Sequence, residues 1–189
     1  MTRIVVPFLL IVVTPLAVAG NWPQWRGPTG DSVCTEPHVP LRWGEQQNVA
    51  WKCPLPDGAS TPAVWGDAIF VTGEDGDTLL ALRIDAASGK VVWSHQVGTG
   101  TPPRERVKTK EGSERLHQRF HKLHNFASPS PVTDGSVVVV HYGSGELIAF
   151  DFAGQELWRH DLQKEYGDYT VWYGHANSPV IAGDLVISA

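Results

Sequence analysis

The chain has 189 residues, and 15 lysines and arginines against 20 aspartates and glutamates give it a net charge of −5. This balance excludes a nucleic-acid-binding protein that relies on a large positive surface. Glycine (19) and proline (14) are frequent, yet 42% of the residues are hydrophobic, which indicates a folded, turn-rich chain and not a disordered one.

Residues 1–19 have the pattern of a secretory signal peptide. Arg3 supplies a positive start, residues 4–18 carry no charge, and Ala17 and Ala19 are small residues before Gly20. The apolar stretch is shorter than the roughly 20 residues that cross a bilayer. We therefore expect cleavage before Gly20, no membrane span in the mature chain, and export to the periplasm or the extracellular space.

Cys34 and Cys53 are the two cysteines of the chain. In an oxidising compartment they could form a disulfide, which would contribute about 3 kcal/mol on the chain-entropy model. The alternative is a pair of small buried thiols. A zinc site is not expected, because the sequence contains no Cys-x-x-Cys pair.

Three segments of the mature chain repeat a pattern. Each has Ser or Thr before a proline, a glycine four positions after that proline, and then a β-branched run. The proline and glycine pairs are Pro62 and Gly66, Pro131 and Gly135, and Pro179 and Gly183. Turn signals between apolar runs predict antiparallel hairpins, with three to four short strands in each copy.

Tryptophans mark the period of the repeat. Trp51 and Trp93 are 42 residues apart, close to the roughly 40 to 45 residues of a four-stranded propeller blade, whereas Trp93 and Trp158 are 65 apart. Removing residues 99–125 restores the period. We therefore expect an all-β chain, a β-propeller of four-stranded antiparallel blades. Residues 20–189 would supply about two full blades plus partial ones, with a charged insert at 99–125.

The insert holds an array of basic residues and histidines. On a helix capped by Ser113, His117, His121 and His124 would form one stripe, which could hold a metal ion. The excess of lysine and arginine could instead bind an anionic ligand or partner. The simplest alternative is a solvated loop, and we expect no metal site.

A second set of polar residues precedes the Ser-Pro steps that open two of the copies. They are His124, Asn125, His175 and Asn177. Equivalent positions in neighbouring blades face the same rim, so these side chains could meet a shared ligand, with Trp172 and Tyr173 as stacking surfaces. The alternative is that the asparagines satisfy turn backbones.

Two copies also share alanine, aspartate, glycine and tryptophan in the same order. These residues are Ala81, Asp85, Gly89 and Trp93, then Ala149, Asp151, Gly154 and Trp158. The order resembles the repeat Ala-x-Asp-x-x-Thr-Gly-x-x-x-Trp of the β-propellers built from pyrroloquinoline-quinone (PQQ) repeats, in the quinoprotein alcohol dehydrogenase-like superfamily. The first copy departs by two extra residues after Ala81 and by Ser88 for Thr, and the second lacks one residue after Asp151. The start "NWPQWRGPTGD" is also similar to the opening of exported bacterial members.

The resemblance implies that the tryptophan docks between adjacent blades and that a closed propeller has seven or eight blades. The 170 residues from 20 to 189 cannot supply seven blades of about 40 residues each. We therefore expect an N-terminal fragment of a longer protein, with an edge that missing C-terminal blades or self-association would cover. The alternative is a short natural chain that assembles with partners.

In PQQ-dependent members, the resemblance implies a disulfide of adjacent cysteines, calcium held by Glu, Asn and Asp, and a catalytic Asp. Cys34 and Cys53 are not adjacent, and no residue can be matched to the calcium ligands or to the catalytic Asp. We therefore predict an exported, non-catalytic interaction scaffold with a protein partner and no cofactor, similar to the outer-membrane assembly propellers. The alternative is part of an alcohol or sugar dehydrogenase that uses PQQ with calcium.

Overall fold

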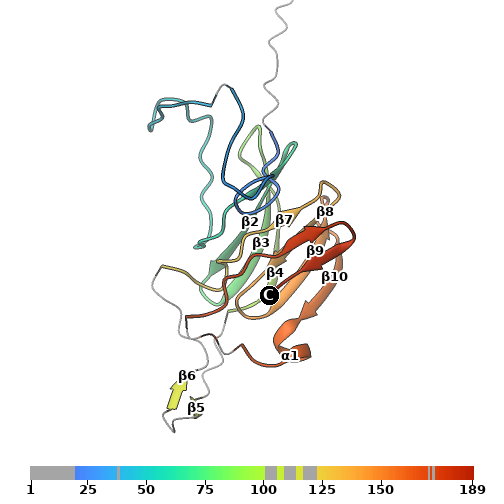
Figure 1. The fold of residues 1–189 in the computed structure, drawn as a ribbon. Helices are drawn as coiled ribbons and strands as arrows, with labels where there is room; N and C mark the ends of the chain where they lie inside the picture. The colour runs from blue at the N-terminus through green and yellow to red at the C-terminus, as the bar shows by residue number, and fades with distance from the viewer. Residues whose placement is uncertain are drawn as a thin grey trace, which may run out of the picture.

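A computed structural model describes residues 20–37, 39–100, 106–108, 114–116, 123–169, 171 and 173–189 (Figure 1). The predicted signal peptide, residues 1–19, lies outside the described residues. Two four-stranded antiparallel sheets, which we call blade 1 and blade 2, lie side by side and are followed by a two-stranded unit.

Blade 1 follows the first sequence repeat. Its strands are β1 (Ala63–Trp65), β2 (Ala68–Asp75), β3 (Thr78–Asp85) and β4 (Val91–Thr99), hydrogen-bonded in that order. Gly66, at φ 58°, occupies the left-handed region in the turn between β1 and β2, where glycine carries no Cβ penalty. Outside the sheet, Trp22 pairs with Val64 of β1 through two backbone hydrogen bonds of 2.8 and 2.9 Å.

Blade 2 repeats this arrangement with β7 (Val132–Thr133), β8 (Val137–His141), β9 (Glu146–Asp151) and β10 (Glu156–Asp161). A single helical turn, α1 (Leu162–Tyr166), follows, and Asp161 caps it by accepting a hydrogen bond from the Lys164 amide. The third unit contains only β11 (Val180–Ala182) and β12 (Leu185–Ile187). The predicted antiparallel blades therefore form.

The insert differs from the prediction. Its described residues form a hairpin of β5 (Arg106–Lys108) and β6 (Glu114–Leu116). The predicted helix after Ser113 is therefore wrong at its first turn, because the backbone of residues 114–116 is hydrogen-bonded to the strand β5. His117 and His121 lie outside the described residues.

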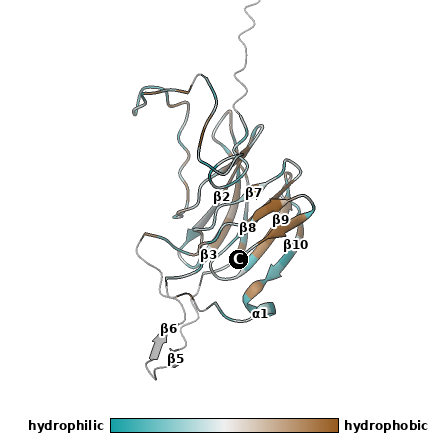
Figure 2. Cartoon of the chain, in the orientation of Figure 1, coloured by the Kyte–Doolittle hydropathy of each residue, from teal (hydrophilic) through white to brown (hydrophobic). Residues whose placement is uncertain are grey.

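The main core lies between the facing sides of blades 1 and 2. It is built from alternate residues of the central strands, including Phe70, Leu79, Ala81, Val138, Val140, Ile148 and Phe150. Figure 2 shows the consequence in blade 2, where β9 is hydrophobic while β10 and α1 are largely hydrophilic. The other face of blade 2 packs on the third unit through Val132, Val139, Leu147 and Ala149. Burial of apolar area between the sheets is thus the main stabilising contribution.

Both cysteines are free in the structure. Cys34 is exposed in the segment before blade 1, whereas Cys53 packs against Val71, Leu82 and Ile84 on the outer face of blade 1. The Cys53 thiol lies 3.6 Å from the Pro54 carbonyl oxygen. The structure therefore shows neither the possible disulfide nor a pair of buried thiols, because Cys34 is exposed.

The repeated Ser or Thr before each blade-opening proline ties one blade to the next. The Thr61 amide donates to Ser130 Oγ at 2.9 Å, and the Ser130 amide donates to Ser178 Oγ, also at 2.9 Å. Thr61, Ser130 and Ser178 occupy the same position of the repeat, directly before its proline. The hydroxyls of Ser130 and Ser178 thus each satisfy a backbone donor of the preceding copy.

Ser130→Ala is expected to lower the free energy of unfolding by about 1–3 kcal/mol, because the Thr61 amide between the blades loses its acceptor. Denaturant unfolding measures the change. Ser130→Thr is the matched control, since threonine occupies the equivalent position in blade 1 and keeps the hydroxyl. Equal stability of Ser130→Ala and the unmodified chain would show that this hydrogen bond contributes nothing.

Candidate functional site

The repeat tryptophans dock on the following unit. Trp93 Nε1 donates to the Phe152 carbonyl oxygen at 3.1 Å, and Trp51 Nε1 donates to the Ala86 carbonyl oxygen at 2.9 Å. Ala86 and Phe152 each follow the repeat aspartate. The same geometry therefore links Trp51 and Trp93 to the unit that follows each of them.

The repeat glycines make this approach possible. A Cβ on Gly89 would overlap the Trp51 ring, and a Cβ on Gly154 would meet the Trp93 ring at 3.0 Å. Both glycines also have positive φ, 69° and 94°. No other residue suits both the backbone conformation and the contact.

The repeat aspartates accept hydrogen bonds from nearby backbone amides, and the repeat alanines are buried. Asp85 Oδ1 accepts from the Ser88 amide, and Asp151 Oδ1 accepts from the Gln155 amide. Hydrogen bonds from the Ser88 side chain and then its amide hold the pKa of Asp85 below its ordinary value. Ala81 and Ala149 are fully buried. Trp158 and Trp93 are half-buried and not fully enclosed.

The structure places the four residues anticipated at the rim in two separate locations. Asn125 Oδ1 accepts from the Ala127 amide, and the Asn125 amide donates to Ser128 Oγ, so this asparagine satisfies its own turn. His124 and Asn125 line a small cavity of about 330 Å³ together with residues 57–59. His175 and Asn177 lie elsewhere, between blade 2 and the third unit, so the four do not share one cavity.

A buried aromatic cluster surrounds His175. Its ring stacks on Tyr169, with centroids 4.4 Å apart, and meets the His141 ring at 4.6 Å. His141 is completely buried at the end of β8. Within the described part of the chain, the buried Nε2 of His175 has no hydrogen-bond partner. Sequence reasoning singled out His175 but missed His141 and Tyr169. We call these three residues the histidine cluster.

Both ring nitrogens of His141 are engaged. Nδ1 lies 3.3 Å from the Asn177 carbonyl oxygen and Nε2 lies 3.2 Å from the Tyr169 hydroxyl. Because a carbonyl oxygen only accepts, the hydrogen bond to Asn177 requires a proton on Nδ1, and the Tyr169 hydroxyl then donates to Nε2. The Ser188 hydroxyl also lies 3.4 Å from Nδ1. Thr72, at the equivalent position of blade 1, likewise donates to a carbonyl two residues before a blade-opening proline, that of Pro129 at 3.2 Å. This repeat position is the signal that could have identified His141.

Burial keeps the histidine cluster uncharged. Burial, and then the neighbouring His175, lowers the pKa of His141 to about 4. Burial also lowers the pKa of His175 and raises the pKa of Tyr169 to about 12. A neutral, doubly hydrogen-bonded imidazole has no free nitrogen to act as a base, so His141 ties the blade to the following segment.

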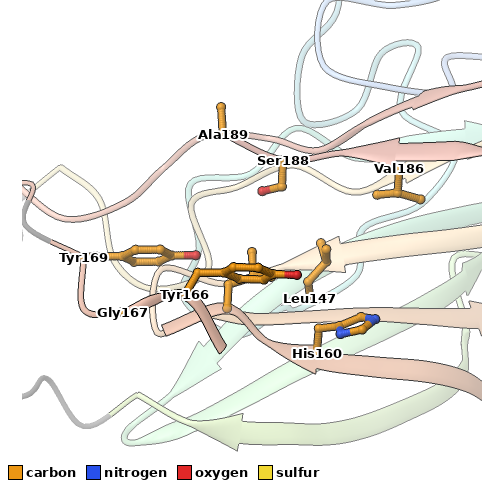
Figure 3. A pocket seen from close by; sticks show the side chains of 9 residues that line it. Leu147, His160, Tyr166, Gly167, Tyr169, Val186, Ser188 and Ala189 are labelled. Carbon is orange, nitrogen blue, oxygen red and sulfur yellow. The ribbon is translucent and has the colours of Figure 1, made fainter. Parts of the chain in front are cut away.

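A cavity of about 550 Å³ adjoins the cluster and shares Tyr169 with it (Figure 3). Figure 3 shows Leu147 and His160 on one side and Val186 and Ser188 on the other, with the Tyr166 side chain between them. His160 Nδ1 lies 3.0 Å from Glu165 at the surface. The lining combines apolar side chains with the polar groups of His160, Tyr166, Tyr169 and Ser188.

Two features that the PQQ resemblance implies for its quinone-dependent members, adjacent bridged cysteines and a cluster of metal ligands, are not seen among the described residues. Cys34 and Cys53 are free and far from adjacent in sequence. Among the residues with described positions, no three His, Cys, Asp or Glu side chains lie together as metal ligands would. In the same residues, no helix is long and apolar enough to cross a bilayer.

Comparison with known proteins gives a family. The family model described as outer membrane protein assembly factor BamB, a PQQ-repeat model, matches residues 43–189. No curated protein matches the chain. Among solved structures, BamB from Moraxella catarrhalis is similar at 17% identity, with 68% of this chain and 42% of that chain covered and a TM-score of 0.26.

The computationally designed Ika8 protein is similar at 16% identity, with 66% of this chain and 40% of that chain covered and a TM-score of 0.24. The chain thus spans about two-fifths of the length of these two structures. The family match covers most of the chain and includes both complete repeats. The chain therefore belongs to the family of PQQ-repeat β-propellers that the BamB model describes.

Proposed function

We propose that this chain is an exported β-propeller that acts as a non-catalytic scaffold for a protein partner and uses no cofactor. The carrying observation is the exposure of large apolar side chains in residues 24–55, which we call the N-terminal arm. Leu41 is 90% exposed and Trp43 is 73% exposed. Exposed apolar groups of this size are typical of surfaces that bind other proteins.

Local hydrogen bonds hold Trp43 in place at the surface. Gly44 and Gln47 exchange two backbone hydrogen bonds of 3.0 Å directly after it, and Asn48 Nδ2 donates to the Arg42 carbonyl oxygen at 2.8 Å. The arm lies to one side of the blades, in blue to cyan (Figure 1). A tryptophan on a closed turn loses little conformational entropy on binding, which favours its use as an anchor.

The family supports the same role. Its description, an outer membrane protein assembly factor, names a function in the assembly of outer membrane proteins. His141 of the histidine cluster supports it too, since both of its ring nitrogens are engaged by other groups of the chain. Export follows from the signal pattern of residues 1–19.

Photo-crosslinking in cells tests the proposal. A photoreactive amino acid at Leu41 should give one discrete adduct with another protein, and Trp43→Ala should abolish that adduct by removing the neighbouring anchor. The matched control is the same label at Val91, which is exposed on β4. The exported protein should begin at or within a few residues of Gly20 on N-terminal sequencing.

Any of the following results would overturn a part of the proposal. The absence of an adduct at Leu41 would exclude the arm as a binding surface, and an adduct that persists in Trp43→Ala would exclude Trp43 as its anchor. Dye reduction that requires added PQQ and calcium would favour the dehydrogenase. An intact Met1 in soluble cytoplasmic protein would contradict export.

A further inference from the structure

The chain pairs with both blades directly after its predicted cleavage site. Trp22 exchanges two backbone hydrogen bonds with Val64 of β1, of 2.8 and 2.9 Å. The Pro23 carbonyl oxygen accepts a hydrogen bond from the Thr133 amide of β7 at 2.9 Å. β1 and β7 are the first strands of blades 1 and 2. The start of the predicted mature chain therefore joins the two blades.

The residues that follow bring a carboxylate back to this start. A loop closed by the hydrogen bond from the Ser32 amide to the Arg26 carbonyl oxygen, 2.9 Å long, lies between the two places. After the loop, Glu36 lies beside Gly20, and Glu36 Oε1 accepts a hydrogen bond from the Gly20 nitrogen. The first residue of the predicted mature chain is thus held by a side chain of the N-terminal arm.

The charge of Glu36 has no cationic partner among the residues whose positions are described. Glu36 is half-buried, and the ion pairs of the described residues involve other carboxylates, those of Glu45, Asp67, Glu156 and Glu165. The Gly20 nitrogen is a neutral amide while residue 19 is attached. Cleavage before Gly20 would turn it into an α-amino group, which is largely protonated at pH 7. The same contact would then gain the attraction between opposite charges.

We propose that Glu36 binds the α-ammonium group that cleavage before Gly20 creates, so that processing holds the start of the mature chain against blades 1 and 2. Glu36 belongs to the N-terminal arm, whereas Trp22 and Pro23 pair with β1 and β7. One ion pair therefore connects the arm to both blades. The precursor has the same hydrogen bond without the added charge. The inference rests on the export proposed above and does not depend on the protein partner.

Amide hydrogen exchange measures how firmly this start is held. A chain that begins at Gly20, released from a fusion by a site-specific protease, is compared with one that begins at Ala17, where the ammonium lies three residues further away. Glu36→Gln keeps an acceptor but removes the charge. In the chain that begins at Gly20, this substitution should speed exchange of the Val64 and Thr133 amides about two- to fivefold, the usual effect of an exposed ion pair. In the chain that begins at Ala17, it should change neither amide.

The reactivity of the α-amino group gives a second, direct readout. In the chain that begins at Gly20, this group should react more slowly with an acylating reagent than it does in Glu36→Gln, because the carboxylate favours the protonated, unreactive form. Glu45→Gln is the matched control, since Glu45 is an exposed carboxylate of the same arm that pairs with Lys52. It should alter neither the exchange rates nor the acylation rate.

The outcomes separate this inference from the export on which it rests. Equal effects of Glu36→Gln in the two chains, or equal acylation with and without the carboxylate, would overturn the ion pair. Exported protein that begins at Gly20 but gives either of these results would overturn the inference alone. Exported protein that begins at another residue would overturn the role of Gly20 and leave export intact. Intact Met1 in cytoplasmic protein would overturn both.

Discussion

Trp93→Ala is expected to lower the free energy of unfolding by about 3–5 kcal/mol, the usual cost of removing a large aromatic side chain from a packed site. The Trp93 ring lies against three others, with centroid distances of 6.0 Å to Phe70, 5.7 Å to Phe150 and 5.0 Å to His95. Its loss therefore opens a cavity between blades 1 and 2. Denaturant unfolding of the purified variant gives the value.

Two variants separate packing from hydrogen bonding at this site. Trp93→Phe keeps much of the ring packing but removes the donor to the Phe152 carbonyl oxygen. Its free energy of unfolding should therefore lie between those of Trp93→Ala and the parent. Trp25→Ala, at an exposed tryptophan of the N-terminal arm, should change stability by under about 0.5 kcal/mol. A loss below about 1 kcal/mol for Trp93→Ala would contradict the inter-blade docking.

Acidification from pH 7 to pH 4 is expected to cost about 3 kcal/mol of stability through His141. Its pKa in the folded chain is about 4 and its ordinary value is 6.5. Between these values the unfolded chain binds a proton that the folded chain does not, and each pH unit costs about 1.4 kcal/mol. The stability is therefore fully present above pH 6.5 and is lost as the pH falls towards 4. His175, whose pKa is also lowered by burial, acts in the same direction.

Comparing the pH dependence of the unfolding free energy in the parent and in His141→Gln separates the contribution of His141 from that of the carboxylates. His141→Gln keeps a side-chain donor for the Asn177 carbonyl and an acceptor for the Tyr169 hydroxyl but cannot be protonated in this range. Its unfolding free energy should vary less between pH 7 and pH 4 than that of the parent. His160→Gln, at a half-exposed histidine paired with Glu165, should keep most of the parent's pH dependence. Identical pH profiles for the parent and His141→Gln would show that His141 is not held neutral.

The blades could be predicted because their signals are local and repeated. Gly66 and Gly135 each stand in a turn between apolar runs, and the antiparallel pairing of β1 with β2 and of β7 with β8 follows from such turns. The secondary structure of the insert was harder to predict, because a three-residue strand such as β6 depends on pairing with β5 and not on a periodicity of its own. Cys34 and Cys53 could not be assigned from spacing alone, since bridging requires a geometry that only the fold provides.

The contacts among the three residues of the histidine cluster could not be predicted from sequence. Tyr169 is 28 positions from His141 and His175 is 34 positions away, and no local rule connects residues at such separations. They meet because β8 ends beside the segment that leads from α1 to the third unit. Of the four residues anticipated at the rim, only His175 belongs to this cluster and only Asn177 contacts it.

The sequence by itself determined the all-β architecture, the blade period and the positions of the repeat residues, because hairpin turns, strand alternation and repeated tryptophans are encoded over short distances. The tertiary structure decided what the repeat residues contact: the carbonyl that receives Trp93, the hydroxyls that link Thr61 to Ser130, and the burial that neutralises His141. These features arise where one unit packs on the next, and packing between units depends on side chains far apart in the sequence.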